Sequence, residues 1–334
     1  MKNVCDIFLM REHENFSPHA FLTENTRGRE HPYEKCANRT EFQRDRDRIL
    51  HSGSFRRLMY KTQVFLAPTG DSYRTRLTHT LEVTQISRII ARALRLNEDL
   101  CESIALGHDL GHTPFGHAGE DAMRMCYSPD FTHYNQSLRV VEVLEKDGKG
   151  LNLTYEVRDG IVNHTGSNMA STLEGVIVKF ADRIAYINHD IDDACAAGIM
   201  KHEDIPKHLR ELLGETHSGR INRMVTSIIN TSTDKPFIQM EPEVQAATDE
   251  LRAFLFERVY RHPAVMSETT KGKKLLCSLY EYFMSHPEKM MPFYVSNIER
   301  DGKERCVCDY LSGMTDRFAI ETYRELMIPK AWGE

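Results

Sequence analysis

Apolar residues recur at helical spacing through most of this chain, and this periodicity constrains the fold more than any other feature. One segment shows it clearly, with apolar side chains at Leu77, Leu81, Ile86, Ile89, Ile90, Ala93 and Leu94. Such spacing is typical of an amphipathic helix with one buried face. Strand patterns are weak, and 64–66 and 237–240 are the two candidates. The sequence therefore predicts an all-α fold.

The same periodicity divides the chain. Residues 1–40 are polar and aperiodic, so we expect an N-terminal arm without a fold of its own. Residues 41–215 are expected to form a helical core, and residues 216–334 a C-terminal helical extension packed on it. Helices are expected at 49–58, 77–94, 100–110, 136–146, 154–163, 173–196, 205–213, 221–229, 244–261, 270–285 and 309–324.

The composition is that of an ordinary globular protein. Of the 334 residues, 40% are hydrophobic and 28% are charged, which is enough apolar material for a sizeable core. No apolar run approaches the roughly 20 residues that cross a bilayer, so we expect a cytoplasmic protein with no membrane partner. The eight cysteines are scattered and are expected to be reduced thiols, with Cys306 and Cys308 in a charged loop.

The net charge of −6 argues against a protein that coats nucleic acid, because binding to the phosphate backbone needs a broad basic surface. Cations are nevertheless concentrated between Arg39 and Arg76. One interpretation is a solvated, salt-bridged helix face, since acidic residues are interleaved there. The other is a docking place for a compact polyanion. Both stay open at this point.

Four ionisable side chains interrupt apolar helical segments. His79 lies in an amphipathic helix, the pair His108-Asp109 lies in an apolar run, and Asp182 follows another. Burying an unpaired imidazole or carboxylate costs several kcal/mol, so such groups are paired or bound to metal. Each residue alone has an ordinary explanation as a hydrogen-bonded core residue, whereas a shared cation would satisfy all four at once.

The order His, then His-Asp about 30 residues later, then Asp resembles the signature of the HD superfamily of phosphohydrolases. The resemblance implies that the helical core is an HD domain. It also implies that His79, His108, Asp109 and Asp182 ligate one divalent metal ion. Two imidazoles and two carboxylates suit Mn²⁺, Mg²⁺, Fe²⁺, Ni²⁺ or Zn²⁺.

A longer motif is more specific. The run His108-Asp-Leu-Gly-His-Thr-Pro-Phe-Gly-His-Ala-Gly-Glu120 resembles the extended motif of the dGTP triphosphohydrolase family. Further blocks resemble the same family, including Arg74-Thr-Arg-Leu-Thr-His, Asp182-Arg-Ile-Ala-Tyr and Gly313-Met-Thr-Asp-Arg-Phe-Ala. Together these blocks span residues 39–320, which is most of the chain.

The resemblance implies roles for residues beyond the metal ligands. His117 corresponds to the family's active-site histidine, and Glu120 to the carboxylate that orients it. We expect His117 in a loop after the helix-ending Pro114, where pairing with a carboxylate suits it for general acid or base chemistry. The alternative is a surface histidine without a role. His112 and His133 match family histidines that line the site, as phosphate contacts or as supports for His117.

Substrate contacts are implied in the same way. Arginine donates bidentate hydrogen bonds to phosphate, and Arg76 lies one helical turn before His79, so we expect it at the α-phosphate. The other residues matched to family contacts are Arg183 for phosphate, Tyr186 and Asp190 for the sugar, Gln63 near base and sugar, and Arg252 and Tyr260 for distal phosphates and base. For the last two, a surface arginine and a core tyrosine are the alternative.

The implied reaction is attack of metal-activated water on the α-phosphorus of a dNTP, which yields deoxynucleoside and tripolyphosphate. The dGTP preference is open, because the chain lacks the long insertion of the larger dGTP-specific members. Two alternatives remain: an HD phosphohydrolase of nucleoside monophosphates or guanosine polyphosphates, and a nucleotide-sensing or single-strand-binding protein. The resemblance further implies a homo-oligomer, a tetramer or hexamer, and raises the question of a nucleotide activator.

Overall fold

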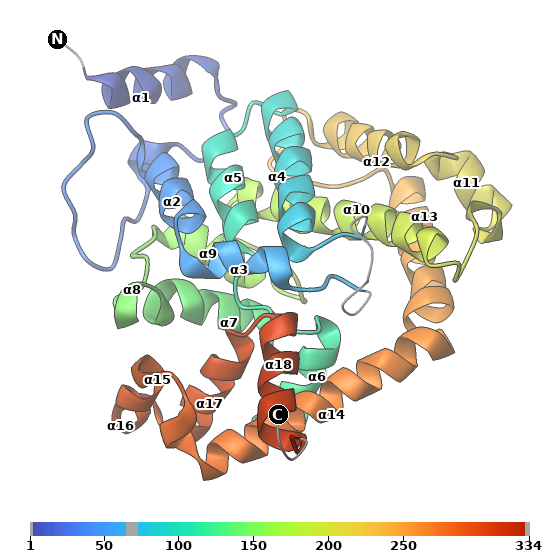
Figure 1. Ribbon diagram of the computed structural model, residues 1–334. Helices are drawn as coiled ribbons and strands as arrows, with labels where there is room; N and C mark the ends of the chain where they lie inside the picture. Colours follow the sequence, from blue (N-terminus) through green and yellow to red (C-terminus); the bar gives the residue numbers. More distant parts are fainter. Residues whose placement is uncertain (1–2, 65–72, 331–334) are drawn as a thin grey trace.

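The computed structural model describes residues 3–64 and 73–330, and over these ranges the chain is helical and has no strand (Figure 1). The β pairing in the same ranges consists of two isolated bridges, Arg29 with Thr154 and Thr62 with Thr75. The predicted all-α fold class is confirmed. No helix of the described part combines the length and hydropathy needed to span a membrane.

The larger of two hydrophobic cores surrounds three helices that pack on one another: α4 (Arg76–Ala93), α5 (Glu98–Gly107) and α10 (Leu173–Ala196). Their inward side chains, such as Ile86, Ile104 and Ile184, are almost fully buried. The helices that complete this region are α2 (Glu41–Leu50), α3 (Gly53–Arg57), α7 (His133–Arg139), α9 (Tyr155–Asn163), α11 (Lys207–Leu213), α12 (His217–Ser232) and α13 (Pro242–Leu255).

Helix α10 shows how local sequence sets an element. Thr172 caps its N-terminus by accepting a hydrogen bond from the Gly175 amide, which satisfies a donor that the first turn leaves free. The 24-residue helix then buries one apolar face, which includes Ile177 and Ile187. Its bounds, 173–196, are those predicted from periodicity. The helix is long enough to carry several site residues on a single face.

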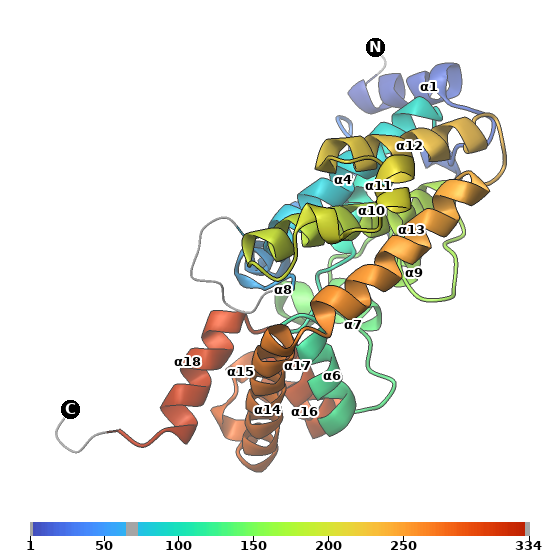
Figure 2. The same cartoon turned by 90° about the vertical axis from the view of Figure 1, so that its right-hand side faces the viewer.

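The second core lies at the other end of the elongated molecule (Figure 2). The segment 108–116 between α5 and α6, which we call the motif loop, leads into α6 (His117–Cys126). The second core joins α6 to helices far along the sequence: α14 (Pro263–Ser285), α17 (Lys303–Ser312) and α18 (Asp316–Met327). The short helices α15 (Pro292–Ser296) and α16 (Ile298–Asp301) flank them. The C-terminal helices therefore pack directly against the element that begins at His117. The domain boundary at residue 215 stays a prediction.

Several sequence predictions of local structure need correction. The arm 1–40 contains a helix, α1 (Val4–Asn15), which Asn3 and Asp6 cap reciprocally in a capping box. Its apolar residues are clustered at 7–10 and do not recur at helical spacing, so the periodicity on which the prediction relied is absent. The helix expected at 309–324 is two helices, α17 and α18, because Thr315 caps a new helix by accepting from the Phe318 amide.

The remaining corrections concern short segments. Cys306 and Cys308 are buried in α17 and not in a loop, since they face the second core. Residues 237–240 form no strand, and in the other candidate strand, 64–66, the last two residues lie outside the described part. The C-terminal parts of two predicted helices become π-helical turns, at Val140–Leu144 after α7 and Phe256–Tyr260 after α13.

The close approach of α7 to the motif loop gives a stability prediction. A Cβ atom at Gly111 would lie 2.1 Å from the Ser137 backbone nitrogen, and backbone atoms cannot move aside cheaply. We expect Gly111→Ala to lower the free energy of unfolding by about 3 kcal/mol, at the upper end of overpacking effects, as measured by urea denaturation.

Gly53→Ala is the matched control. A Cβ there first meets the end of the flexible Arg57 side chain, at 3.2 Å, so little loss of stability is expected. Equal losses in the two variants would contradict the tight contact between α7 and the motif loop.

Candidate metal centre and substrate site

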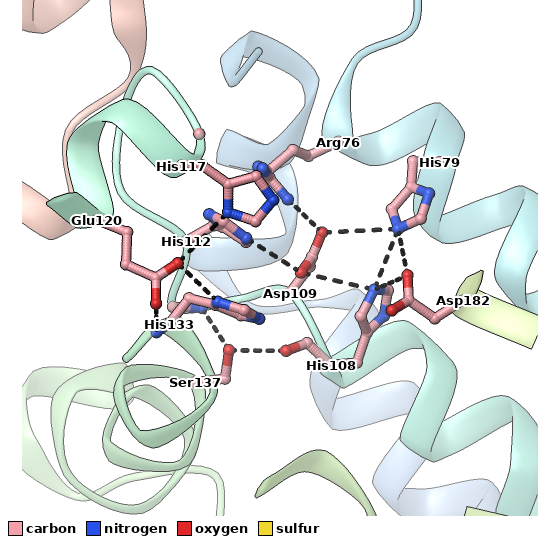
Figure 3. A network of polar contacts seen from close by, with 12 residues as sticks. Arg76, His79, His108, Asp109, His112, His117, Glu120, His133, Ser137 and Asp182 are labelled. Atoms are coloured by element: carbon pink, nitrogen blue, oxygen red, sulfur yellow. Dashed lines mark hydrogen bonds and ion pairs between the residues drawn. The ribbon is translucent and has the colours of Figure 1, made fainter. Parts of the chain in front are cut away.

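The four ionisable residues singled out in the sequence lie together (Figure 3). His79 projects from α4, His108 and Asp109 follow the end of α5, and Asp182 projects from α10. The Nε2 atom of His79 lies 3.3 Å from Nε2 of His108 and 3.1 Å from Oδ1 of Asp182. Oδ1 of Asp109 lies 3.5 Å from Nε2 of His108. Residues more than 100 positions apart thus bring their donor atoms into one group, which we call the donor cluster.

Hydrogen bonds on the far side of the rings orient both imidazoles. Nδ1 of His108 lies 2.6 Å from the Ala105 carbonyl oxygen, which can only accept, so this nitrogen carries the proton and Nε2 presents a lone pair. Nδ1 of His79 lies 3.0 Å from Nε2 of His189. Such outer partners hold metal-binding histidines in place.

The site is a poor place for uncompensated charge. His79, His108 and Asp109 are buried, while the Asp182 side chain is 18% exposed and marks the open side. Burial alone would raise the pKa of Asp109, but His108 and Arg76 hold that pKa well below its usual range. Burial would likewise raise the pKa of Asp182, but the neighbouring His79 outweighs this effect and lowers that pKa.

This donor set fits a divalent metal. Two ligands at about 2.1 Å from one ion are separated by about 3 to 3.4 Å for angles between square and tetrahedral geometry. The distances from Nε2 of His79 to His108 and to Asp182 lie in this range, whereas the His79–Asp109 and His108–Asp182 distances are longer, at 3.9 and 4.0 Å. The residues also supply mixed nitrogen and oxygen donors with the lone pairs turned inward. The cluster can therefore hold a divalent ion.

Arg76 adds a fixed positive charge beside these donors. Its buried guanidinium donates from Nη1 to Oδ2 of Asp109 over 2.7 Å. Beside it the motif loop passes so closely that a Cβ at Gly116 would lie 3.2 Å from Nη2 of Arg76 and 3.0 Å from the Gln63 carbonyl oxygen. Gly116 has a φ of +56°, which also favours glycine. The loop, Arg76 and Gln63 thus lie together.

A second group of side chains lies next to the first. His117 is the first residue of α6, so the prediction of a loop position is wrong: Gly116 turns the chain directly into a helix. Glu120 reaches His133 more closely than His117, with Oε2 3.0 Å from Nδ1 of His133 and 3.5 Å from Nδ1 of His117. Oε1 accepts from Arg124. Although burial opposes it, His117 and His133 hold the pKa of Glu120 far below its usual range.

The two histidines on Glu120 differ in exposure. The His117 side chain is 79% exposed, so its ring faces the open side and can reach a bound molecule. His133 is buried and stacks on His112, with ring centroids 4.2 Å apart. His112 is buried as well, with Nε2 3.8 Å from Oδ1 of Asp109. The histidine cluster is therefore continuous with the candidate metal ligands.

The face of α10 beyond Asp182 collects the remaining candidates. Tyr186 and Asp190 follow at helical intervals, and the Tyr260 hydroxyl donates to Oδ2 of Asp190. Burial raises the pKa of Tyr186 to about 12, so its hydroxyl stays protonated. Arg183 pairs with Asp249 of α13 over 3.2 Å and is partly exposed. Arg252 is exposed on the same helix as Asp249.

Sequence reasoning missed four residues here. His164 and His189 are buried beside the candidate ligands, with ring centroids 4.9 Å from His108 and 5.2 Å from His79, respectively. Lys61 is buried, and its ammonium donates to the carbonyl oxygens of His112 and Ser312; burial lowers its pKa to about 7. Asp316 accepts from the Thr62 and Phe115 amides. His164 ends an apolar helix as His108 does, and this was the available signal.

Comparison with known proteins agrees with this geometry. The HD domain model matches residues 76–187, and the phosphohydrolase-associated domain model matches residues 238–325. A deoxyguanosinetriphosphate triphosphohydrolase-like protein of Caldanaerobacter subterraneus subsp. tengcongensis is 54% identical over 97% of this chain and 95% of its own length. The chain belongs to the deoxyguanosinetriphosphate triphosphohydrolase-like family. It is an HD phosphohydrolase, and the HD class of hydrolases is metal-dependent.

Other relatives place the chain in the same family. The protein of the same name from Desulfatibacillum aliphaticivorans is 46% identical and covers 96% of this chain and 97% of its own. Among solved structures, a phosphohydrolase from Bacteroides thetaiotaomicron has a TM-score of 0.53 with 16% identity, over 84% of this chain and 68% of that one. This last similarity concerns the fold alone.

If Asp182 is a metal ligand, metal binding should raise the free energy of unfolding and this gain should depend on Asp182. For one site, an ion at 100 times its dissociation constant stabilises the folded state by about 2.7 kcal/mol. We expect Mn²⁺ to raise the unfolding free energy of EDTA-treated protein by this amount, and Asp182→Asn to lose most of the gain.

The matched control is Asp192→Asn on the same helix. Asp192 pairs with Arg74 and His217, away from the donor cluster, so this variant should gain as much stability as wild type. An undiminished gain in Asp182→Asn would rule this carboxylate out as a ligand.

Proposed function

We propose that this protein is a deoxynucleoside triphosphate triphosphohydrolase, which cleaves a dNTP at the α-phosphorus to deoxynucleoside and tripolyphosphate. One observation carries the proposal. The face of α10 runs from Asp182 in the donor cluster to Tyr186 and Asp190, and the Tyr260 hydroxyl closes on Asp190. A nucleotide whose phosphate lies at the donor cluster would therefore meet the Tyr186 ring one helical turn away and the Asp190 carboxylate two turns away. An aromatic ring and a hydrogen-bond acceptor at these places suit binding of the sugar. The names of the relatives support a deoxynucleotide.

Phosphate binding is assigned to the residues around the motif loop. Arg76 contacts the α-phosphate, because its buried guanidinium is already oriented by Asp109. His112 and His133 line the same side. Arg183 and Arg252 lie toward solvent on α10 and α13, where the distal phosphates would extend, and Gln63 lies beside the motif loop, near the sugar.

Sugar selection is assigned to α10. Asp190 accepts a hydrogen bond from the 3′-hydroxyl, with Tyr260 holding its second oxygen. Tyr186 packs against C2′, where a ribose would carry an additional hydroxyl with no room and no partner. This arrangement favours deoxyribose and does not select a base, so dGTP preference is not part of the proposal.

The chemistry needs a cation, a proton donor and fixed positive charge. His79, His108, Asp109 and Asp182 would hold a divalent ion (Mn²⁺, Mg²⁺, Fe²⁺, Ni²⁺ or Zn²⁺), which lowers the pKa of water and neutralises phosphate charge when bound. His117 protonates the departing 5′-oxygen. Glu120 orients its ring through Nδ1, leaving Nε2 to carry the transferred proton. Arg76 stabilises charge that develops on the phosphoryl oxygens.

Product analysis tests the proposal. The Mn²⁺-loaded protein should release tripolyphosphate from dNTPs, supplied singly and in pairs, when products are separated by anion-exchange chromatography. Asp182→Asn should release none, and Asp192→Asn should match wild type. Release of orthophosphate from nucleoside monophosphates, or of pyrophosphate from guanosine polyphosphates, would favour the alternative hydrolases. Binding of single-stranded DNA without any release would favour a sensor.

The role of His117 has its own test. We expect His117→Ala to lower kcat by about 10² to 10⁴, which is the usual contribution of general acid catalysis, while metal content stays at the wild-type level. The control is His286→Ala. His286 is an exposed histidine that caps the C-terminus of α14, so its loss should leave kcat unchanged. Near-normal turnover of His117→Ala with metal bound would exclude the acid role.

The proposal extends to assembly and location. We place the protein in the cytoplasm, where dNTP pools are used, as a homo-oligomer such as a tetramer or hexamer. The assay with paired dNTPs tests for a nucleotide activator. If one dNTP activates the protein, it should increase the release of tripolyphosphate from the other.

A further inference from the structure

A series of polar contacts leads from the donor cluster to Asp190. Nε2 of His79 faces the other donors (Figure 3), and Nδ1 of the same ring lies 3.0 Å from Nε2 of His189. On the other side of the second ring, Nδ1 of His189 lies 2.8 Å from Oδ1 of Asp190. All three side chains are almost fully buried. The series therefore joins α4 to α10 beneath the candidate metal centre.

His189 and Asp190 compensate each other. Nδ1 of His189 and Oδ1 of Asp190 are buried, and neither has a hydrogen-bond partner in the part of the chain that the structure describes. A buried polar atom without a partner costs free energy, so the ion pair between these two atoms is what makes their burial acceptable. Oδ2 of Asp190 accepts from the Tyr260 hydroxyl, which fixes the carboxylate from its other side. The carboxylate is therefore held in place against the His189 ring.

The metal centre determines where the ring protons lie. When Nε2 of His79 binds an ion, Nδ1 carries the proton and donates it to Nε2 of His189. The proton of the second ring then lies on Nδ1 of His189 and faces the negative charge of Asp190. This charge favours the tautomer of His189 that presents a lone pair to His79. Carboxylates commonly orient a metal-binding histidine directly, whereas here a second histidine lies between the two.

We propose that Asp190 is a positioning residue of the metal centre, which acts on the candidate ligand His79 through His189. Helix α10 would then serve the centre twice, directly through Asp182 and indirectly through Asp190 two helical turns later. One consequence rests on the proposed function, in which Asp190 also accepts from the 3′-hydroxyl: sugar recognition and metal binding would share one carboxylate. The positioning role itself needs no nucleotide.

Mn²⁺ affinity tests this role in the absence of nucleotide. EDTA-treated full-length protein is titrated with Mn²⁺, and free Mn²⁺ is measured by electron paramagnetic resonance. Loss of an outer partner usually weakens metal binding by about 10- to 100-fold. We expect a loss in this range for Asp190→Asn, because an amide has no charge to hold the His189 tautomer. The control Asp192→Asn, also on α10, removes a carboxylate that pairs with Arg74 and His217, and should bind Mn²⁺ as wild type does.

A double-mutant cycle separates this route from a simple effect of charge. His189→Leu should weaken Mn²⁺ binding by about 10- to 100-fold. Adding Asp190→Asn to it should change the affinity by less than about twofold, because the link is already cut. If the negative charge of Asp190 acted on the ion directly, Asp190→Asn would weaken binding equally in both backgrounds, and that result overturns the proposal.

His189→Gln is the conservative variant. A glutamine amide can still accept from Nδ1 of His79 but does not reproduce the Nδ1 proton that faces Asp190. Its Mn²⁺ affinity should lie closer to wild type than that of His189→Leu, and it should be insensitive to Asp190→Asn. Circular dichroism checks that each variant folds, and the cycle is run in the His189→Gln background if His189→Leu does not.

Unchanged Mn²⁺ affinity in Asp190→Asn also overturns the proposal. Neither result bears on whether dNTPs are cleaved, because release of tripolyphosphate from the wild-type protein decides that question separately. A protein that releases tripolyphosphate but binds Mn²⁺ equally well with and without the Asp190 charge would retain the proposed function and lose this positioning role.

Discussion

The convergence of His79, His108, Asp109 and Asp182 is the interaction on which the rest of the structure depends. Three of these side chains are buried, and buried ionisable groups are stable only with partners. The packing of α4, α5 and α10 brings the donors together, while Ala105, His189 and Arg76 satisfy the atoms that face away. The central helices therefore carry both the hydrophobic core and the polar site.

The C-terminal helices are part of the same arrangement. Asp316 at the start of α18 accepts hydrogen bonds from the Thr62 and Phe115 amides, and Lys61 joins the His112 and Ser312 carbonyl oxygens. These buried contacts hold the motif loop between the two hydrophobic cores. Since α6 begins at the end of this loop, the extension positions the first residue of α6 relative to the donor cluster. The phosphohydrolase-associated region is thus joined to the motif loop by hydrogen bonds between side chains and the backbone.

Much of the fold was predictable from periodicity, because a long amphipathic helix repeats its pattern often enough to be recognised. Residues 173–196 were predicted with the observed bounds. The failures have local causes. The apolar residues of α1 do not form a stripe on one face, α6 starts at His117 directly after Gly116, and the 309–324 segment breaks where Thr315 caps a new helix. In each case a capping or turn interaction decides the element and hydrophobicity does not.

By itself the sequence determined the all-α class and the residue types of the donor cluster, because a histidine or aspartate in an apolar run must find a partner wherever the chain folds. Tertiary structure alone decided which partners they find. Glu120 lies closer to His133 than to His117, His164 faces His133, and Asp316 reaches the motif loop from 200 residues away. Such contacts depend on how whole helices pack, and packing geometry leaves no short-range pattern along the chain.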